Sequence, residues 1–126
     1  MITAGCDVGS LTAKAVVLER DTVLASCVMR ALTSPSESAS RVMEDALKQA
    51  GLTMNDLDCV IGTGYGRQQI PFANGVESEI SCHAKAAWKL MPSAGMVIDI
   101  GGQDAKATRL NESGSVARYI YNDKCA

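Results

Sequence analysis

The first thirty residues alternate between short apolar runs and polar or glycine-containing turns, a pattern typical of β-strands. Strands are expected at Ile2–Val8, at residues 14–19 and at residues 23–29, with a turn at Arg20-Asp21 before the third. Connections this short join strands that run in opposite directions. The segment therefore predicts an antiparallel sheet of three strands.

A helix with clear start and stop signals follows. Ser34-Pro35-Ser36-Glu37 combines a capping box with proline at the first helical position, and Gly51 ends the helix. The apolar residues between these signals recur at helical spacing. The buried face that they predict consists of Ala39, Val42, Met43, Ala46, Leu47 and Ala50.

The alternation of strands and helices continues to the end of the chain. A strand is expected at residues 57–61 and a second helix from about Glu79 to Met91, where Pro92 stops it. Three more strands are expected at residues 96–100, 105–110 and 116–121. The predicted buried stripe of the second helix consists of Ile80, Ala84, Ala87, Trp88 and Met91. The order βββαβα followed by βββ favours an α/β fold, in which a mixed β-sheet with flanking helices begins a second time.

Composition excludes several classes of function. With 47% apolar and 21% charged residues, the 126-residue chain can bury a core. A net charge of −2 and an aromatic content of 4% argue against a nucleic-acid partner and against a polybasic membrane surface. The apolar runs are too short to span a bilayer, and no secretory signal is visible at the N-terminus. We therefore expect a cytoplasmic protein with no membrane partner.

The five cysteines are scattered, and no two of them form a C-x-x-C pair. Cys6, Cys27 and Cys59 lie in strand-like segments, where a free thiol behaves as a small hydrophobic group, so we expect them to be buried and reduced. Cys125 lies outside any apolar run and does not fit that explanation. His83 lies beside the apolar stripe of the second helix, and we expect it to form a hydrogen bond rather than bind a metal.

The most informative feature is an internal repeat. Residues of the first hairpin recur 92 positions later without a gap, as the pairs Asp7 and Asp99, Gly9 and Gly101, Ala13 and Ala105, Lys14 and Lys106, Ala15 and Ala107, and Leu18 and Leu110. Each copy is an apolar strand that ends in aspartate, a glycine-bearing turn and a second strand. The spacing is too wide for a solenoid, so a duplicated lobe is the better explanation.

The chemistry of this hairpin suits a nucleotide. Glycine lets the backbone turn closely around a ligand and aim N–H groups at phosphate oxygens, and an aspartate beside those oxygens suits hydrated Mg²⁺. Two such hairpins facing each other would hold a polyphosphate from both sides. One D-x-G turn alone is better explained as a plain β-hairpin, but two copies that both keep aspartate and lysine favour the nucleotide site. Lys14 and Lys106 would either serve that site or lie on the solvent faces of their strands.

Other nucleotide motifs are missing from the sequence. It contains neither a P-loop nor a dinucleotide-binding fingerprint. Gly62-Thr63-Gly64-Tyr65-Gly66 follows a predicted strand, and such a turn is as typical of a structural connection as of a ligand contact.

Five segments carry a resemblance to a known family. They are Asp7-Val8-Gly9-Ser10, Thr63-Gly64-Tyr65-Gly66-Arg67, Glu79-Ile80-Ser81-Cys82-His83-Ala84, residues 97–104, and Asn122-Asp123-Lys124-Cys125-Ala126. In this order they resemble the activator family of 2-hydroxyacyl-CoA dehydratases, which includes the ATP-binding subunits of benzoyl-CoA reductase. That family is similar to actin, hexokinase and the heat-shock chaperone ATPases. The resemblance therefore implies two RNase H-like lobes around a nucleotide, with residues 1–94 forming the first lobe and residues 95–126 the start of the second.

The resemblance also implies cofactors, partners and roles. The protein would be a homodimeric ATPase that binds ATP or ADP, and Asp7 and Asp99 would be catalytic and hold Mg²⁺ through water. The first phosphate loop would be Asp7 to Thr12 and the second Asp99 to Asp104. The residues that bind the nucleotide would be Gly9, Ser10, Leu11, Thr12, Lys14, Gly101, Gly102, Gln103 and Asp104. Cys125 would bind a [4Fe-4S] cluster shared across the dimer and precede a helix whose N-terminus favours the reduced cluster. Ferredoxin or flavodoxin would supply an electron to a 2-hydroxyacyl-CoA dehydratase or benzoyl-CoA reductase component.

The family continues for about another lobe, which holds the second cluster cysteine and the adenosine pocket. We therefore expect these 126 residues to be an N-terminal portion, with apolar strand faces left uncovered. Two other functions stay open. A sugar-type kinase of the same superfamily would need a catalytic base, for which Asp99 could serve, but it leaves Cys125 without a purpose. A non-catalytic nucleotide-binding module would lack turnover.

Overall fold

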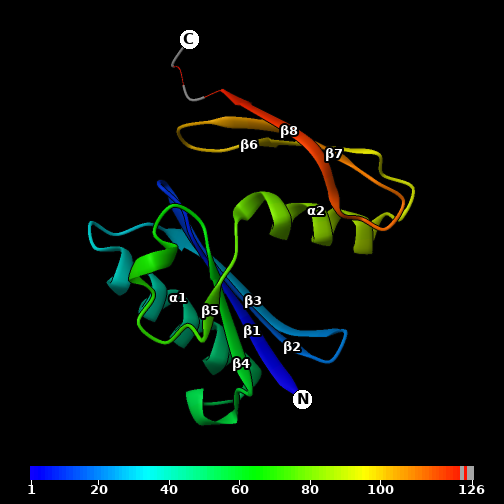
Figure 1. The fold of residues 1–126 in the computed structure, drawn as a ribbon. Coiled ribbons are helices and arrows are strands. Elements are labelled where there is room, and N and C mark those ends of the chain that lie inside the picture. Colours follow the sequence, from blue (N-terminus) through cyan, green and yellow to red (C-terminus); the bar gives the residue numbers. More distant parts are fainter. Residues whose placement is uncertain (123, 125–126) are drawn as a thin grey trace. The chain divides into compact units, whose positions relative to one another are not determined.

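The chain forms two compact units, Met1–Glu77 and Ser78–Ala126, in a computed structural model that describes residues 1–122 and 124 (Figure 1). The lobes expected from the sequence divide the chain after residue 94. The structure instead groups the helix at Glu79–Leu90 with the C-terminal strands, because the helix contacts all three of them. That residues 1–94 and 95–126 belong to two lobes that enclose a nucleotide stays a prediction.

The first unit is built on a mixed sheet of five strands. Strands β1 (Ile2–Val8), β2 (Thr12–Glu19) and β3 (Thr22–Arg30) form the predicted antiparallel sheet, and β4 (Cys59–Thr63) runs parallel to β1. The short strand β5 (Gly75–Val76) adds to β4, so the strand order is β3-β2-β1-β4-β5. The sequence did not predict β5 or the two 3₁₀ turns, η1 (Met54–Asp56) and η2 (Arg67–Gln69), because such short elements have no measurable periodicity.

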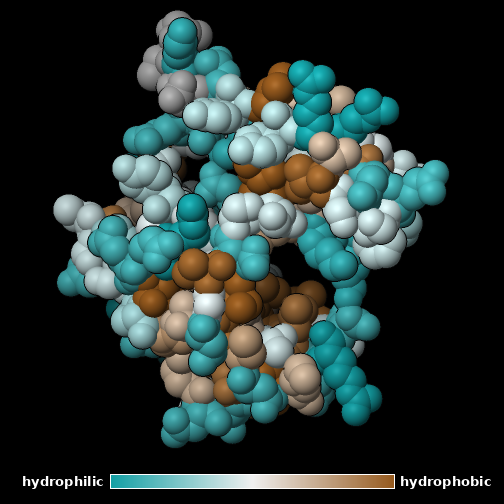
Figure 2. Space-filling model, in the orientation of Figure 1, coloured by the Kyte–Doolittle hydropathy of each residue, from teal (hydrophilic) through white to brown (hydrophobic). Residues whose placement is uncertain are grey.

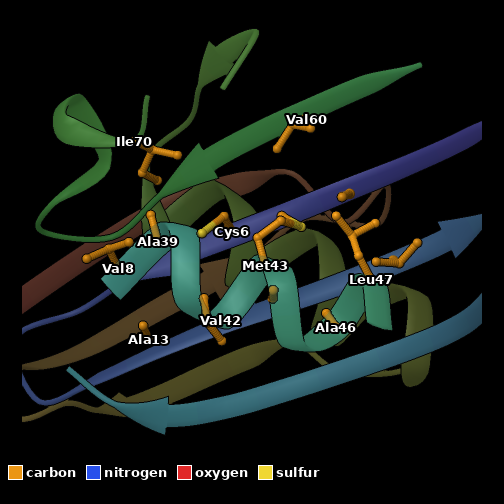
Figure 3. Close-up of a cluster of buried hydrophobic side chains, with 13 residues drawn as sticks. Cys6, Val8, Ala13, Ala39, Val42, Met43, Ala46, Leu47, Val60 and Ile70 are labelled. Atoms are coloured by element: carbon orange, nitrogen blue, oxygen red, sulfur yellow. The ribbon is translucent and has the colours of Figure 1, made fainter. Parts of the chain in front are cut away.

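Helix α1 (Pro35–Ala50) packs against β1, β2 and β3 and closes the core of the first unit (Figure 3). The Ser34 hydroxyl accepts a hydrogen bond from the Glu37 N–H at 3.3 Å, and Gly51 ends the helix with a φ of 69°. The predicted face is confirmed for five of its members, which are buried: Ala39, Val42, Met43, Ala46 and Leu47. Ala50, in the last turn, is partly exposed.

The second unit consists of one helix and an antiparallel sheet. Helix α2 (Glu79–Leu90) packs against β6 (Met96–Ile100), β7 (Ala105–Leu110) and β8 (Val116–Asn122), which lie in the order β6-β7-β8. Ala84 is buried, and Ile80, Ala87 and Trp88 are partly buried. The prediction that Met91 completes this stripe is wrong. The helix ends at Leu90, so Met91 leaves the helical face and is 60% exposed.

One face of the C-terminal sheet exposes apolar side chains. The strand register places Ile98 opposite Ala107 and Ala107 opposite Ile120, so these residues share a face. Ile98 and Ile120 are exposed, as are Met96 and Ile100 on β6. Figure 2 shows apolar surface, in brown, among hydrophilic residues in this part of the chain.

The described cysteines are free thiols, but they are not equally buried. Cys6 is fully buried in the core, as predicted. The prediction of full burial is wrong for Cys27 and Cys59, which are partly exposed. Cys59 begins β4 on the face away from α1, and Cys27 belongs to β3, the edge strand of its sheet. Among the helices of the described residues, none is long and apolar enough to cross a membrane.

Candidate functional site

The repeat seen in the sequence is also a repeat of backbone geometry. In the first unit Asp7 pairs with Lys14 across the antiparallel strands β1 and β2. In the second unit Asp99 pairs with Lys106 across β6 and β7. The two hairpins therefore have the same register at the acidic end of the first strand.

The turns of the two hairpins are closed by equivalent hydrogen bonds. The Gly9 N–H donates to the Thr12 carbonyl at 3.0 Å, and the Gly101 N–H donates to the Asp104 carbonyl at 2.8 Å. The residues at the tips, Ser10 and Leu11 in one turn and Gly102 and Gln103 in the other, are exposed. Each turn therefore presents an accessible backbone segment beside an aspartate, as a phosphate loop requires.

Asp7 forms an ion pair in the first hairpin. The Lys14 Nζ lies 3.2 Å from the Asp7 Oδ2, and the Lys14 side chain is 40% exposed. Lys14 therefore does not simply point into solvent from its strand, because its charge is held beside the aspartate. Its exposure leaves the ammonium accessible to an anionic ligand at the same turn.

The glycine-rich turn after β4 packs against the end of β1. The Gly66 N–H donates to the Val8 carbonyl at 2.8 Å, and Gly64 adopts a φ of +91°, which favours glycine. A Cβ atom at position 64 would overlap with the Asp7 Oδ1 and with the Val8 carbonyl. The sequence left the role of this turn open. In the structure the turn packs directly against Asp7 and Val8.

Thr63 is a neighbour of Asp7 that the sequence did not single out. Because β1 and β4 are parallel and pair Asp7 with Thr63, both residues lie on the same face at the carboxyl end of the sheet, where α/β folds bind ligands. Within residues 1–122 and 124, the buried hydroxyl of Thr63 has no hydrogen-bond partner. Its place between the predicted strand at residues 57–61 and the glycine-rich turn was the available signal.

Asp99 has a different environment in the second hairpin. Its Oδ2 lies 3.2 Å from the Nδ1 of His83 on α2 and 4.0 Å from the Nζ of Lys106. Lys106 instead lies 2.7 Å from the Glu79 Oε1 and 2.7 Å from the Asp104 Oδ1. The sequence predicts that His83 is a hydrogen-bonding or boundary residue, and its polar contact with Asp99 agrees with that expectation.

Lys106 is buried and charged. Burial lowers the pKa of its ammonium, but hydrogen bonds and charge interactions with Asp104 and Glu79 outweigh that effect, so the pKa lies above the usual 10.5. Its side chain is only 9% exposed. Lys106 therefore does not lie on a solvent face, and it joins the start of α2 to the second turn.

Sequence reasoning missed Glu79 as a site residue and did not connect His83 with Asp99. The available signal was the spacing of four residues between Glu79 and His83, which places both on one side of a helix. Only the packing of that helix on β6 and β7 shows which residues they meet.

The described residues offer carboxylates that could hold Mg²⁺ through water, but no direct metal site. Asp7 and Asp99 each offer carboxylate oxygens beside a turn, the ligand type that Mg²⁺ prefers. No group of three or more His, Cys, Asp or Glu side chains that could hold a metal occurs within the described part of the chain. Burial raises the pKa of the Cys6 thiol to about 12, so Cys6 is protonated at neutral pH. Cys125, the predicted cluster ligand, lies outside the described residues.

A separate open groove of about 700 Å³ lies beside the first half of α1. Met29, Leu32, Arg41, Glu44 and Pro71 are among its lining residues. It contains none of the residues predicted to bind the nucleotide or the metal, so we do not assign it to that site.

Comparison with known proteins yields close relatives. The activator of lactoyl-CoA dehydratase from Anaerotignum propionicum is 44% identical over 128 residues, which are 100% of this chain and 49% of that protein. The 2-hydroxyisocaproyl-CoA dehydratase activator from Clostridioides difficile is 39% identical, with 100% and 47% covered. One of the benzoyl-CoA reductase subunits from Thauera aromatica is 33% identical, with 99% and 46% covered. The chain thus spans about half the length of these relatives.

Solved structures agree with these relationships. The activator of the 2-hydroxyisocaproyl-CoA dehydratase from Clostridium difficile, with bound ADPNP, superposes with a TM-score of 0.93 at 38% identity, covering 100% of this chain and 47% of that one. The ROK hexokinase from Thermus thermophilus matches with a TM-score of 0.65 at 15% identity over 94% of this chain and 48% of that one, which shows a shared fold alone. The family model described as the BadF/BadG/BcrA/BcrD ATPase family matches residues 4–126. The chain therefore belongs to the BadF/BadG/BcrA/BcrD ATPase family.

Proposed function

We propose that the whole protein is an ATP-dependent activator that passes a low-potential electron to a 2-hydroxyacyl-CoA dehydratase or a benzoyl-CoA reductase component. The observation that carries this proposal is the duplicated hairpin, with its aspartate, its register and its closing hydrogen bond repeated in both units. Family membership and the named roles of the relatives support it.

In this proposal the two hairpins bind the phosphates of ATP or ADP from either side. The first loop, with Lys14, and the second loop present backbone N–H groups and one accessible ammonium to the phosphate oxygens. Asp7 and Asp99 accept hydrogen bonds from water and so hold hydrated Mg²⁺. The bound ion would neutralise phosphate charge. A related activator has been solved with ADPNP, which supports a nucleotide of this class.

The electron-transfer part of the proposal concerns Cys125 and the assembly of the protein. Cys125 and a second cysteine would join their counterparts in a homodimer to hold one [4Fe-4S] cluster, which ferredoxin or flavodoxin would reduce. The nucleotide would bias the hairpin-bearing units between two arrangements and so couple ATP hydrolysis to the transfer. This coupling rests on the family resemblance and on the relatives, which are named as activators.

The nucleotide site is tested by replacing each aspartate with its neutral isostere. Asp7→Asn and Asp99→Asn should each lower ATP hydrolysis at least tenfold in the intact protein while leaving its iron content unchanged. Asp45→Asn, on the exposed side of α1, is the matched control and should keep wild-type turnover. Unchanged hydrolysis in both site variants would refute the proposal that the two hairpins bind the nucleotide phosphates.

The cluster is tested separately by Cys125→Ser. This variant should lose the iron and the visible absorbance of a [4Fe-4S] cluster and still bind ADP. Iron retained at the wild-type ratio would remove Cys125 from the proposal. If the protein phosphorylated an added sugar instead, it would be a kinase.

A further inference from the structure

The two aspartates of the repeat have equivalent positions but different partners. Asp7 pairs with the lysine opposite it in the register, at 3.2 Å. Asp99 has only a longer contact of 4.0 Å with the corresponding lysine, which makes two contacts of 2.7 Å with Glu79 and Asp104. Of the two side chains that contact the Asp99 carboxylate, the His83 imidazole is closer, at 3.2 Å against 4.0 Å for Lys106.

Lys106 cannot readily take the role that Lys14 has. Its side chain is 9% exposed, whereas that of Lys14 is 40% exposed, and two short contacts fix its ammonium. Moving it toward Asp99 would leave Glu79 and Asp104 without their cation in a partly buried site, which costs free energy. Asp99 therefore depends on another residue for its orientation.

His83 is placed to orient Asp99. The neighbouring residue Ala84 is buried between α2 and the sheet, which sets the rotation of the helix. The His83 Nδ1 then lies 3.2 Å from the Asp99 Oδ2. A carboxylate oxygen only accepts hydrogen bonds, so His83 orients Asp99 in those forms of the imidazole that carry a proton on Nδ1.

We propose that His83 is the positioning residue of Asp99, holding one carboxylate oxygen so that the other is free for water bound to magnesium. The proposal deepens the proposed function and rests on it, since it assumes that Asp99 serves the nucleotide-bound ion. The imidazole contacts one carboxylate oxygen at 3.2 Å, whereas the Lys106 ammonium, 4.0 Å from the same oxygen, is held by Glu79 and Asp104, so the second oxygen of Asp99 is left for the hydrated cation. Partners of this kind typically change metal affinity 10- to 100-fold when removed.

The test compares three variants of the intact protein. His83→Ala removes the donor, His83→Asn keeps an amide N–H near the position of Nδ1, and Lys85→Ala is the control on the exposed side of the same helix. Three quantities are measured for each variant: the Mg²⁺ concentration for half-maximal ATP hydrolysis, ADP binding in EDTA by calorimetry, and the midpoint of thermal unfolding.

We expect His83→Ala to raise the half-maximal Mg²⁺ concentration about tenfold or more. ADP binding in EDTA and the unfolding midpoint should stay at wild-type values, and His83→Asn should restore most of the Mg²⁺ response. An unchanged Mg²⁺ response in His83→Ala would overturn the proposal. So would equal losses in all three quantities, because they would indicate a role in folding only.

A readout on the protein without nucleotide separates this proposal from the proposed function. The side-chain carboxyl ¹³C shift of Asp99 should change in His83→Ala and return toward the wild-type value in His83→Asn. If the wild-type protein bound no nucleotide, the proposed function would fail while this shift still showed the pairing. A shift that is the same in all variants would show that His83 does not hold Asp99.

Discussion

Gly64 lies against the Asp7 carboxylate so closely that any side chain at position 64 would overlap with the Asp7 Oδ1. The same atom would also overlap with the Val8 carbonyl, which is backbone and cannot turn aside. A turn that follows β4 therefore limits where the acidic end of β1 can lie. The glycine at position 64 is required by its neighbours as well as by its own φ of +91°.

Gly64→Ala should destabilise the protein more than Gly51→Ala. Both glycines have positive φ, 91° and 69°, so both variants lose about 1–2 kcal/mol to backbone strain. Position 51 has no atom within 4 Å of an added Cβ, whereas position 64 meets Asp7 and Val8. We expect a further loss of about 1–3 kcal/mol for Gly64→Ala from overpacking, measured by urea unfolding. Equal losses in the two variants would show that the turn yields easily and does not confine Asp7.

Lys106→Met should mainly lower the stability of the protein, whereas Lys14→Met should mainly weaken ADP binding. Lys106→Met leaves Glu79 and Asp104 without their cation, so it should cost about 1–3 kcal/mol of stability, between the values for exposed and buried pairs. Lys14→Met removes one partly exposed pair and should cost less than about 1 kcal/mol, but it should weaken ADP binding several-fold. Urea unfolding and calorimetry measure the two effects. If Lys106→Met were as mild as Lys14→Met, the two hairpins would be equivalent.

Strong local periodicity explains how much of the fold the sequence predicts. The strands at residues 2–30 and the helix α1 carry regular apolar spacing and cap signals, and the structure confirms them within a few residues. The prediction that Met91 is buried is wrong because the apolar spacing continues one residue past Leu90, where helix α2 ends. The prediction that Cys27 is buried is wrong because β3 is an edge strand, with a neighbouring strand on one side only, and its apolar composition does not reveal this.

The site is predicted only in part, because its contacts are long-range. The positions of Asp7, Asp99 and the two turns follow from the repeat, which is visible in the sequence. The partner of Asp99 does not follow, because His83 is 16 residues away on a helix whose rotation depends on the burial of Ala84. Two lysines at equivalent repeat positions also differ in exposure, and the contacts of Lys106 with Glu79 and Asp104 are not those of Lys14, which pairs with Asp7.

Thr63→Val should leave the stability of the protein unchanged or raise it by up to about 1 kcal/mol. In the described part of the chain the buried hydroxyl has no hydrogen bond to lose, and a methyl group of similar size removes the cost of burying it. Urea unfolding without nucleotide measures the change, and Thr63→Ala, which leaves a small cavity, should be less stable than Thr63→Val. A loss above about 1 kcal/mol in Thr63→Val would show that the hydroxyl has a partner in the folded state.

Cys6 should make the protein less stable at alkaline pH. Burial, and to a lesser extent the Asp7 charge, raise the pKa of the Cys6 thiol from 9.0 to about 12 in the folded state. Between these values the unfolded chain releases the thiol proton and the folded chain keeps it, so the free energy of unfolding falls as pH rises above 9. From pH 8 to 10.5 the wild type should lose about 2 kcal/mol more than Cys6→Ala, in which this group is gone. Urea unfolding under reducing conditions gives both curves. Other groups that titrate in this range, such as Lys106, are present in both proteins and cancel in the difference, so parallel curves would show that the Cys6 thiol ionises equally in both states.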